Sequence, residues 1–125
     1  MKKIINSINA PAPIGPYSQA IEVNNILFIS GQIPISPGEG KIISTSVTEQ
    51  TEQVFYNINA ILKSAGYSFE NVVKTTVFMN DMNNFSAMND IYKKYFHNNC
   101  PARSTVAVKE LPQGALVEIE IIAVK

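Results

Sequence analysis

The chain has 125 residues, of which 46% are hydrophobic and 16% are charged, and its formal net charge is zero. This length suits one domain with a core of its own, over residues 1–125. The absence of a basic patch argues against nucleic acid as the main partner. No apolar run approaches the roughly 20 residues of a membrane span, and no signal-peptide pattern follows the first lysines. We therefore expect a cytoplasmic protein, and its low charge favours association with further copies.

The N-terminal segment predicts a short edge strand over residues 4–9, followed by a rigid loop. Three prolines lie between residues 11 and 16, which excludes a helix or a central strand there. Such a loop can hold the ring of Tyr17 in place for a functional role. The alternative, which the sequence favours, is that Tyr17 simply covers the core.

A β-hairpin is predicted next, with strands over residues 20–23 and 26–30. The Asn-Asn pair between them tolerates the positive φ angles of a tight turn. Ser30 and Gly31 end the second strand. A glycine here permits close approach of a ligand or another chain, or it marks a bulge in a curved sheet.

Two helices with a strand between them occupy the middle of the chain. The first is predicted from Ser46 as N-cap, with Glu49 completing a capping box, to a stop at Gly66. Its apolar residues recur at helical spacing, and its polar residues, including Gln50 and Asn57, are assigned largely to the other face. Residues 72–79 are rich in β-branched side chains, as strands are.

The second helix is predicted to start after an N-cap at Asp81 or Asn83. Its stripe of methionine and aromatic residues is more typical of a core than of a ligand site. Asn89 lies one residue from that stripe and could project inward.

The last quarter of the chain predicts two strands, over residues 101–108 and 115–124, joined as a terminal hairpin. Glu118 and Glu120 share one face of the second strand, because strand residues two apart point the same way. Carboxylates in so apolar a strand are costly unless paired, and Arg103 is the partner that the sequence suggests. The pair is interpreted equally well as a structural ion pair or as a site for a small anionic substrate with a base.

The order strand-strand-helix-strand-helix-strand-strand predicts an α+β domain, a mixed sheet with two helices on one face. The other face of the sheet would be open and too apolar for water, which favours a face-to-face oligomer. A metal site is not expected, since the chain has one histidine and one cysteine. A Cys-His nucleophile pair and a serine triad are both disfavoured for lack of an orienting partner.

Six motifs in order along the chain resemble the RidA family, also called YjgF, of enamine/imine deaminases. They are Ile14-Gly-Pro-Tyr-Ser-Gln-Ala, Ser30-Gly-Gln-Ile-Pro, Val73-Lys-Thr-Thr-Val-Phe, Met88-Asn-Asp-Ile-Tyr, Pro101-Ala-Arg-Ser-Thr-Val and Val117-Glu-Ile-Glu. The resemblance implies a chorismate-mutase-like fold and a homotrimer with sites between subunits. It also implies hydrolysis of 2-imino acids, such as 2-iminopropanoate and 2-iminobutanoate, to 2-oxo acids and ammonia, with no cofactor.

The resemblance also assigns roles to residues. Arg103 would bind the substrate carboxylate, and Glu118, rather than Glu120, would position a water. Thr105 stands where many members have a cysteine, which puts regulation through a thiol in doubt more than it does hydrolysis. Substrate-binding positions are implied for Tyr17, Ser30, Gly31, Asn89, Ser104 and Thr105.

Two other functions fit the same family. One is a non-catalytic, ligand-binding or regulatory trimer, as some relatives are described as translation inhibitors or endoribonucleases. The zero net charge counts against RNA as the main substrate. The other is a deaminase for a different enamine, such as an aminomuconate.

Overall fold

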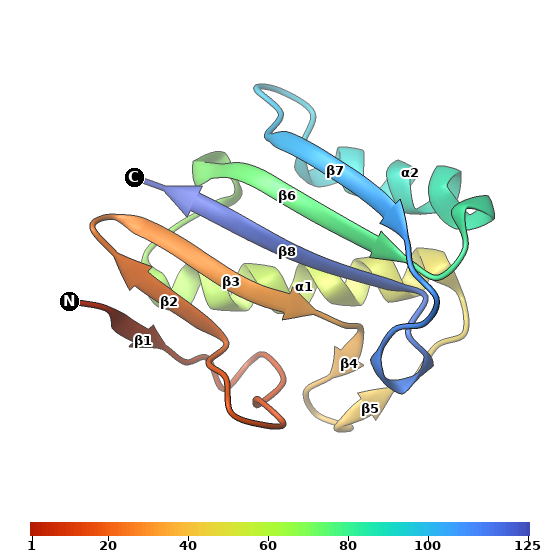
Figure 1. Cartoon of the computed structure of the whole chain (residues 1–125), viewed down its shortest axis with the longest axis horizontal. Coiled ribbons are helices and arrows are strands. Elements are labelled where there is room, and N and C mark those ends of the chain that lie inside the picture. Colours follow the sequence, from red (N-terminus) through yellow and green to blue (C-terminus); the bar gives the residue numbers. More distant parts are fainter.

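A six-stranded sheet with two helices behind it forms the framework of the chain (Figure 1). All residues from 1 to 125 are described in a computed structural model. The strand order β1-β2-β3-β8-β6-β7 includes one parallel pair, β6 with β7, so the sheet is mixed. The elements are β1 (Lys3–Ile5), β2 (Ala20–Val23), β3 (Ile26–Gln32), β4 (Ile35–Ser36), β5 (Lys41–Ile42), α1 (Val47–Ala65), η1 (Phe69–Asn71), β6 (Val72–Met79), η2 (Met82–Asn84), α2 (Phe85–Tyr95), β7 (Ala102–Ala107), η3 (Pro112–Gly114) and β8 (Val117–Val124).

The predicted terminal hairpin is wrong, although both of its strands exist. β8 lies between β3 and β6 and pairs antiparallel with both, whereas β7 pairs in parallel with the far side of β6. The burial of the two strands agrees with these positions in the sheet. Every second residue of β8 is fully buried, which suits a central strand, and β7 is exposed along almost all of its length, which suits an edge.

The hairpin of β2 and β3 is confirmed. Asn24 and Asn25 have φ angles of 50° and 62°, the left-handed values that a tight two-residue turn requires. The predicted edge strand is present but short, since β1 ends at Ile5. The loop after β3 contains a small β4–β5 hairpin that was not expected.

α1 begins and ends where the sequence predicts. The Ser46 hydroxyl accepts a hydrogen bond from the Glu49 backbone N–H at 3.3 Å, and Gly66 ends the helix with a φ of 79°. The capping box is only half formed, because the Glu49 carboxylate accepts a hydrogen bond from Ser44 instead.

Two polar residues of α1 lie on the buried face, contrary to the predicted assignment. The Asn57 amide donates to the carbonyl oxygens of Ile33 and Ile35. The Gln50 amide donates to the Ser44 carbonyl, and its oxygen accepts from the Leu116 N–H. Both side chains therefore satisfy backbone groups of the loops at one end of the sheet, which hydrophobic periodicity alone does not reveal.

The core lies between the sheet and the helices. Its largest fully buried side chains come from α1, β3, β6, β8 and α2, and the aromatic stripe of α2 packs as predicted. Phe55 of α1 stacks on Tyr95 of α2 with ring centroids 4.3 Å apart. Asp81 caps η2, the short turn that precedes α2. The predicted fold class, an α+β domain with two helices on one face of a mixed sheet, is confirmed.

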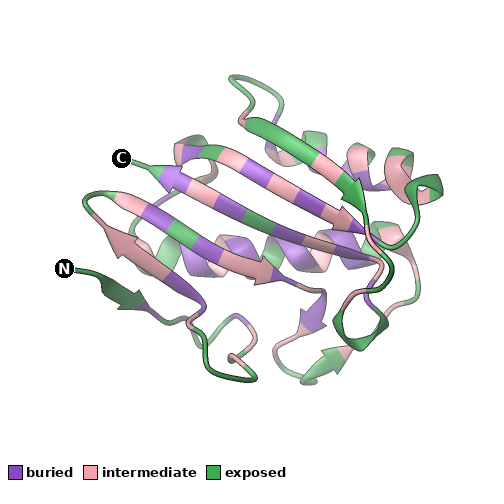
Figure 2. Cartoon of the chain, in the orientation of Figure 1, coloured by how far each residue is buried: buried purple, intermediate pink, exposed green.

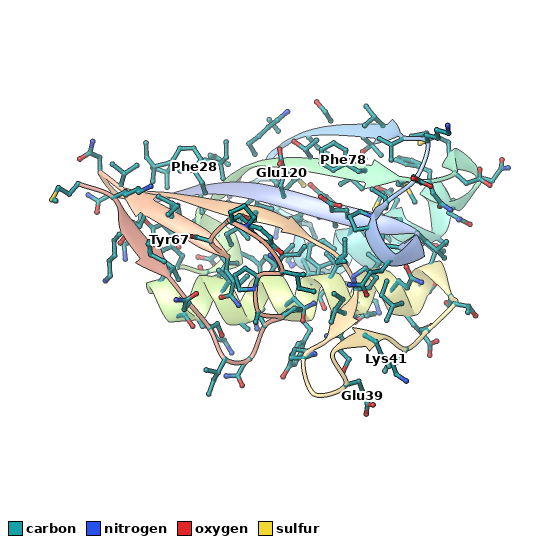
Figure 3. All side chains as sticks on the ribbon, turned by 60° about the horizontal axis from the view of Figure 1, so that its bottom comes forward. Phe28, Glu39, Lys41, Tyr67, Phe78 and Glu120 are labelled. Atoms are coloured by element: carbon teal, nitrogen blue, oxygen red, sulfur yellow. The ribbon has the colours of Figure 1, made fainter.

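The other face of the sheet is open, as predicted. Figure 2 shows the alternation of buried and more exposed residues along β6 and β8. In Figure 3, Phe28, Phe78 and Glu120 point away from α1. The register places an apolar row across this face, formed by Ile4, Ile21, Phe28 and Ile122.

None of the helices is both long and apolar enough to cross a membrane.

Candidate functional site

A pocket of about 570 Å³ at the end of β3 brings together four of the predicted site residues. Tyr17, Ser30, Gly31 and Glu118 line it, together with Glu120. Its remaining wall is formed by the proline-rich loop, the segment after β3 and the turn before β8. The pocket is therefore built from four separate stretches of the chain, and its polar groups come mainly from β3 and β8.

The proline-rich loop is fixed by Gln19, a residue that the sequence did not single out. This buried side chain accepts a hydrogen bond from the Ser7 N–H at 2.7 Å and donates to the carbonyl oxygens of Ser7 and Pro11. Tyr17 is 52% exposed, and its hydroxyl accepts from the Ile14 N–H. The ring therefore covers the pocket and not the core, contrary to the interpretation that the sequence favoured.

Ser30 and Gly31 form a bulge, because these two residues of β3 lie opposite the single residue Glu120 of β8. The Ser30 hydroxyl donates to the Ser18 carbonyl at 2.6 Å. A side chain on Gly31 would collide with Glu118, since an added Cβ would lie 2.8 Å from its Cδ and closer still to Oε2. The bulge interpretation is thus confirmed. The close approach that Gly31 permits in this chain is that of the chain's own Glu118 carboxylate, and an approach by a ligand or another chain stays a prediction.

The position of Glu118 makes it a better base than an ordinary glutamate. Half-burial raises the pKa of its carboxyl group, and the nearby charge of Glu120 raises it further. Glu120 itself is exposed and belongs to neither of the two ion pairs in the chain, so it does not form the pairing with Arg103 that the sequence suggests for the carboxylates of β8. A carboxyl whose pKa is shifted toward neutrality is suited to accepting a proton from water.

Arg103, the only arginine of the chain, lies elsewhere. Its guanidinium donates a 2.7 Å hydrogen bond to the amide oxygen of Asn89 on α2. The guanidinium carbon lies 4.5 Å from the centre of the Tyr92 ring and 5.4 Å from that of Phe85. The Tyr92 hydroxyl is in turn 2.7 Å from the hydroxyl of Thr75. An amide and two rings thus orient an exposed cation that has no carboxylate partner.

The predicted pairing of Arg103 with Glu118 does not occur within one chain. Arg103 is in register with Thr75, which faces the helices, whereas Glu118 alternates with the buried Val117 and Ile119 and so faces the open side. β6 also separates their two strands. Side chains on opposite faces of one sheet cannot share a ligand, so one chain alone does not assemble the predicted constellation.

The remaining predicted residues divide between the two faces. Ser104 lies on the open face, where its hydroxyl accepts a 3.1 Å hydrogen bond from Lys74. Thr105 is on the Arg103 side, and its hydroxyl is buried with no hydrogen-bond partner.

Cys100 is exposed and donates to the Phe96 carbonyl. No group of three His, Cys, Asp or Glu side chains is placed to hold a metal ion.

The close approach at Gly31 leads to a testable expectation. In Gly31→Ala the new methyl group should push the Glu118 carboxyl toward solvent and lower its pKa toward the ordinary glutamate value. The cost in stability should be about 1 kcal/mol, because the displaced group is the end of a flexible side chain. Carboxyl NMR titration measures the pKa. Gly38→Ala is the control, as its added Cβ meets nothing within 4 Å. An unchanged Glu118 pKa in Gly31→Ala would contradict the expectation.

Comparison with known proteins places the chain in a family. The family model described as Endoribonuclease L-PSP matches residues 7–125. A RutC family protein of Pyrococcus horikoshii is 54% identical over 125 residues, which cover 100% of this chain and 99% of the relative. The 2-iminobutanoate/2-iminopropanoate deaminase of Mus musculus is 48% identical over 100% of this chain and 93% of the relative.

A solved structure supports the same assignment. E. coli TdcF with bound serine superimposes with a TM-score of 0.93 and 40% sequence identity, over 98% of each chain. Both the sequence matches and this structure extend over essentially the whole domain. The chain therefore belongs to the endoribonuclease L-PSP family, the RidA/YjgF family that its six motifs resemble.

Proposed function

We propose that this protein is a hydrolytic deaminase that converts reactive 2-imino acids to 2-oxo acids and ammonia. Its substrates would be 2-iminopropanoate and 2-iminobutanoate, so that it removes reactive metabolites in the cytoplasm. Relatives that bear this deaminase name are 46% to 49% identical to the chain along its full length. TdcF was solved with serine, which shares with a 2-imino acid a carboxylate next to a nitrogen-bearing carbon.

The observation that carries the proposal is the placement of two complementary groups on opposite faces of the sheet. Arg103 is a preoriented guanidinium with no anion to bind, and Glu118 is a base with a raised pKa in an open pocket. A planar guanidinium fork fits a carboxylate through two parallel hydrogen bonds. We infer that a homotrimer joins the Arg103 side of one subunit to the Glu118 pocket of the next, with Asn89 and Tyr17 on the two walls.

The reaction then needs few groups. Arg103 binds the substrate carboxylate and so fixes the neighbouring imine carbon. Glu118 orients a water and accepts one of its protons while the water oxygen bonds to that carbon and the C=N π electrons move to nitrogen. Glu118 then returns the proton to the nitrogen. The carbinolamine hydroxyl then gives its proton to Glu118, which passes it to the amino nitrogen, so that the C–N bond breaks with ammonia as the leaving group while the C=O bond forms.

Positioning accounts for most of the rate that such a site must supply. Imines hydrolyse in water unaided, so the barrier to be lowered is modest. Holding the water and the imine carbon together converts an encounter in solution into a local step. Ser30, Gly31, Ser104 and Thr105 would complete the binding surface around the substrate.

The role of Arg103 is tested by competition for the imine. A serine/threonine dehydratase supplies the imine, semicarbazide traps it, and the protein competes with the trap. Arg103→Ala should lower kcat/KM by on the order of 100-fold, because a charge-assisted, two-point contact is lost. Arg103→Lys should recover only part of the loss, since lysine lacks the fork.

Equal competition by Arg103→Ala and the parent protein would refute the assigned role of Arg103. A parent protein that binds the imine or serine but never competes with the trap would instead be a non-catalytic binding protein.

The role of Glu118 is tested by the pH dependence of the reaction. Glu118 acts as a base only when ionised, so kcat/KM should rise as the pH passes its raised pKa. The Glu120 charge contributes to that rise in pKa. Glu120→Gln should therefore move the acidic limb of the profile to lower pH. Glu70→Gln, at an exposed position of η1, should leave the limb in place. A limb that does not move in Glu120→Gln would contradict the contribution of the Glu120 charge to the pKa of the group that acts as the base.

A further inference from the structure

The open face of the sheet contains two opposite charges that have no partner. Register and alternation place three ionisable side chains of the paired strands on this face, namely Lys74, Glu118 and Glu120. Glu118 belongs to the pocket described above. Lys74 donates only to the neutral Ser104 hydroxyl, and neither Lys74 nor Glu120 takes part in an ion pair.

These two charges lie in a largely apolar surface. Lys74 continues the row that contains Phe28 and Ile122, and Glu120 is in the next row, opposite Thr76. Phe28 is 43% exposed. A hollow of about 400 Å³ in this face is lined by Lys74, Glu120 and the apolar side chains around them. The cation and the anion thus border one depression, with apolar walls from β2, β3 and β8.

An apolar face of this kind is stable in water only if it is covered. Whatever covers it also removes water from Lys74 and Glu120, and a buried charge without a partner is strongly unfavourable. A second copy of this chain meets both requirements, because each copy presents the same apolar rows and offers Glu120 to the cation and Lys74 to the anion of its neighbour. A partner with no charges would offer neither group an ion pair.

We propose that Lys74 of one subunit forms an ion pair with Glu120 of the next when the open faces pack together. This rests on the oligomer of the proposed function and adds to it the contact that fixes how the subunits are aligned. Opposite charges at defined points of an apolar interface select one register, since any other arrangement buries an unpaired charge or places like charges together. Because Glu120 borders the pocket as well as this hollow, the ion pair would connect assembly to the surroundings of Glu118.

Charge reversal tests the proposal through the mass of the assembly, measured by light scattering and sedimentation equilibrium. Lys74→Glu and Glu120→Lys should each weaken association on the order of 100-fold or more, because each brings like charges together. The double variant should restore it. An equimolar mixture of the two single variants should associate more tightly than either alone. Lys63→Glu, the same charge change on an exposed position of α1, is the control and should assemble like the parent.

Two further variants separate assembly from folding. Lys74→Met and Glu120→Gln remove one charge without creating a repulsion, and circular dichroism reports whether each chain folds. Both should fold and associate more weakly than the parent protein. Parent-like assembly of either single charge reversal, or a monomeric parent, would overturn the proposal. If the double variant restores association but the mixture of single variants does not, the ion pair lies within one chain, which would also overturn the proposal.

Failure of this inference is distinct from failure of the proposed function. If charge changes at residues 74 and 120 leave assembly unchanged while the protein still outcompetes the semicarbazide trap, only the ion pair is contradicted. If assembly depends on these charges but the protein never hydrolyses the imine, only the deaminase role is contradicted.

Discussion

The central position of β8 is the constraint on which the rest of the structure depends. Its alternate residues Val117, Ile119, Ile121 and Ala123 are at most 2% exposed and face the helices. Strand geometry then forces Glu118 and Glu120 onto the opposite face. The same residues that anchor the core thus present two carboxylates beside the pocket, and a slip of one residue in register would reverse both arrangements.

The neighbours of β8 turn that constraint into a site. β3 supplies the bulge at Ser30 and Gly31, where the missing side chain leaves room for the Glu118 carboxyl. β6 separates β8 from β7, and the parallel pairing of β7 directs Arg103 toward α2, where Asn89 and Tyr92 orient it. One sheet therefore carries a cation on one face and a carboxyl group of raised pKa on the other. We infer that function requires the two faces of different subunits to meet.

Much of this arrangement could be predicted from local patterns. The Asn-Asn turn, the caps of α1, the aromatic stripe of α2 and the alternation along β8 are signals within a few residues of each other, and all were confirmed. Strand pairing depends on distant segments, so adjacent strands were assigned to a hairpin that does not form. Gln19 was not singled out, and Gln50 and Asn57 were assigned to the wrong face, because their partners are backbone groups of other segments of the chain.

Mixing two inactive variants tests the central claim most directly, namely that Arg103 and Glu118 act together only across subunits. Each of the variants Arg103→Ala and Glu118→Gln lacks one half of the site. The two proteins are denatured together and refolded as mixed oligomers. In an equal mixture about one quarter of the interfaces combine an intact arginine with an intact glutamate, so about one quarter of the parent deaminase activity should return. Mixed oligomers that remain as inactive as the two variants alone would contradict a site shared between subunits.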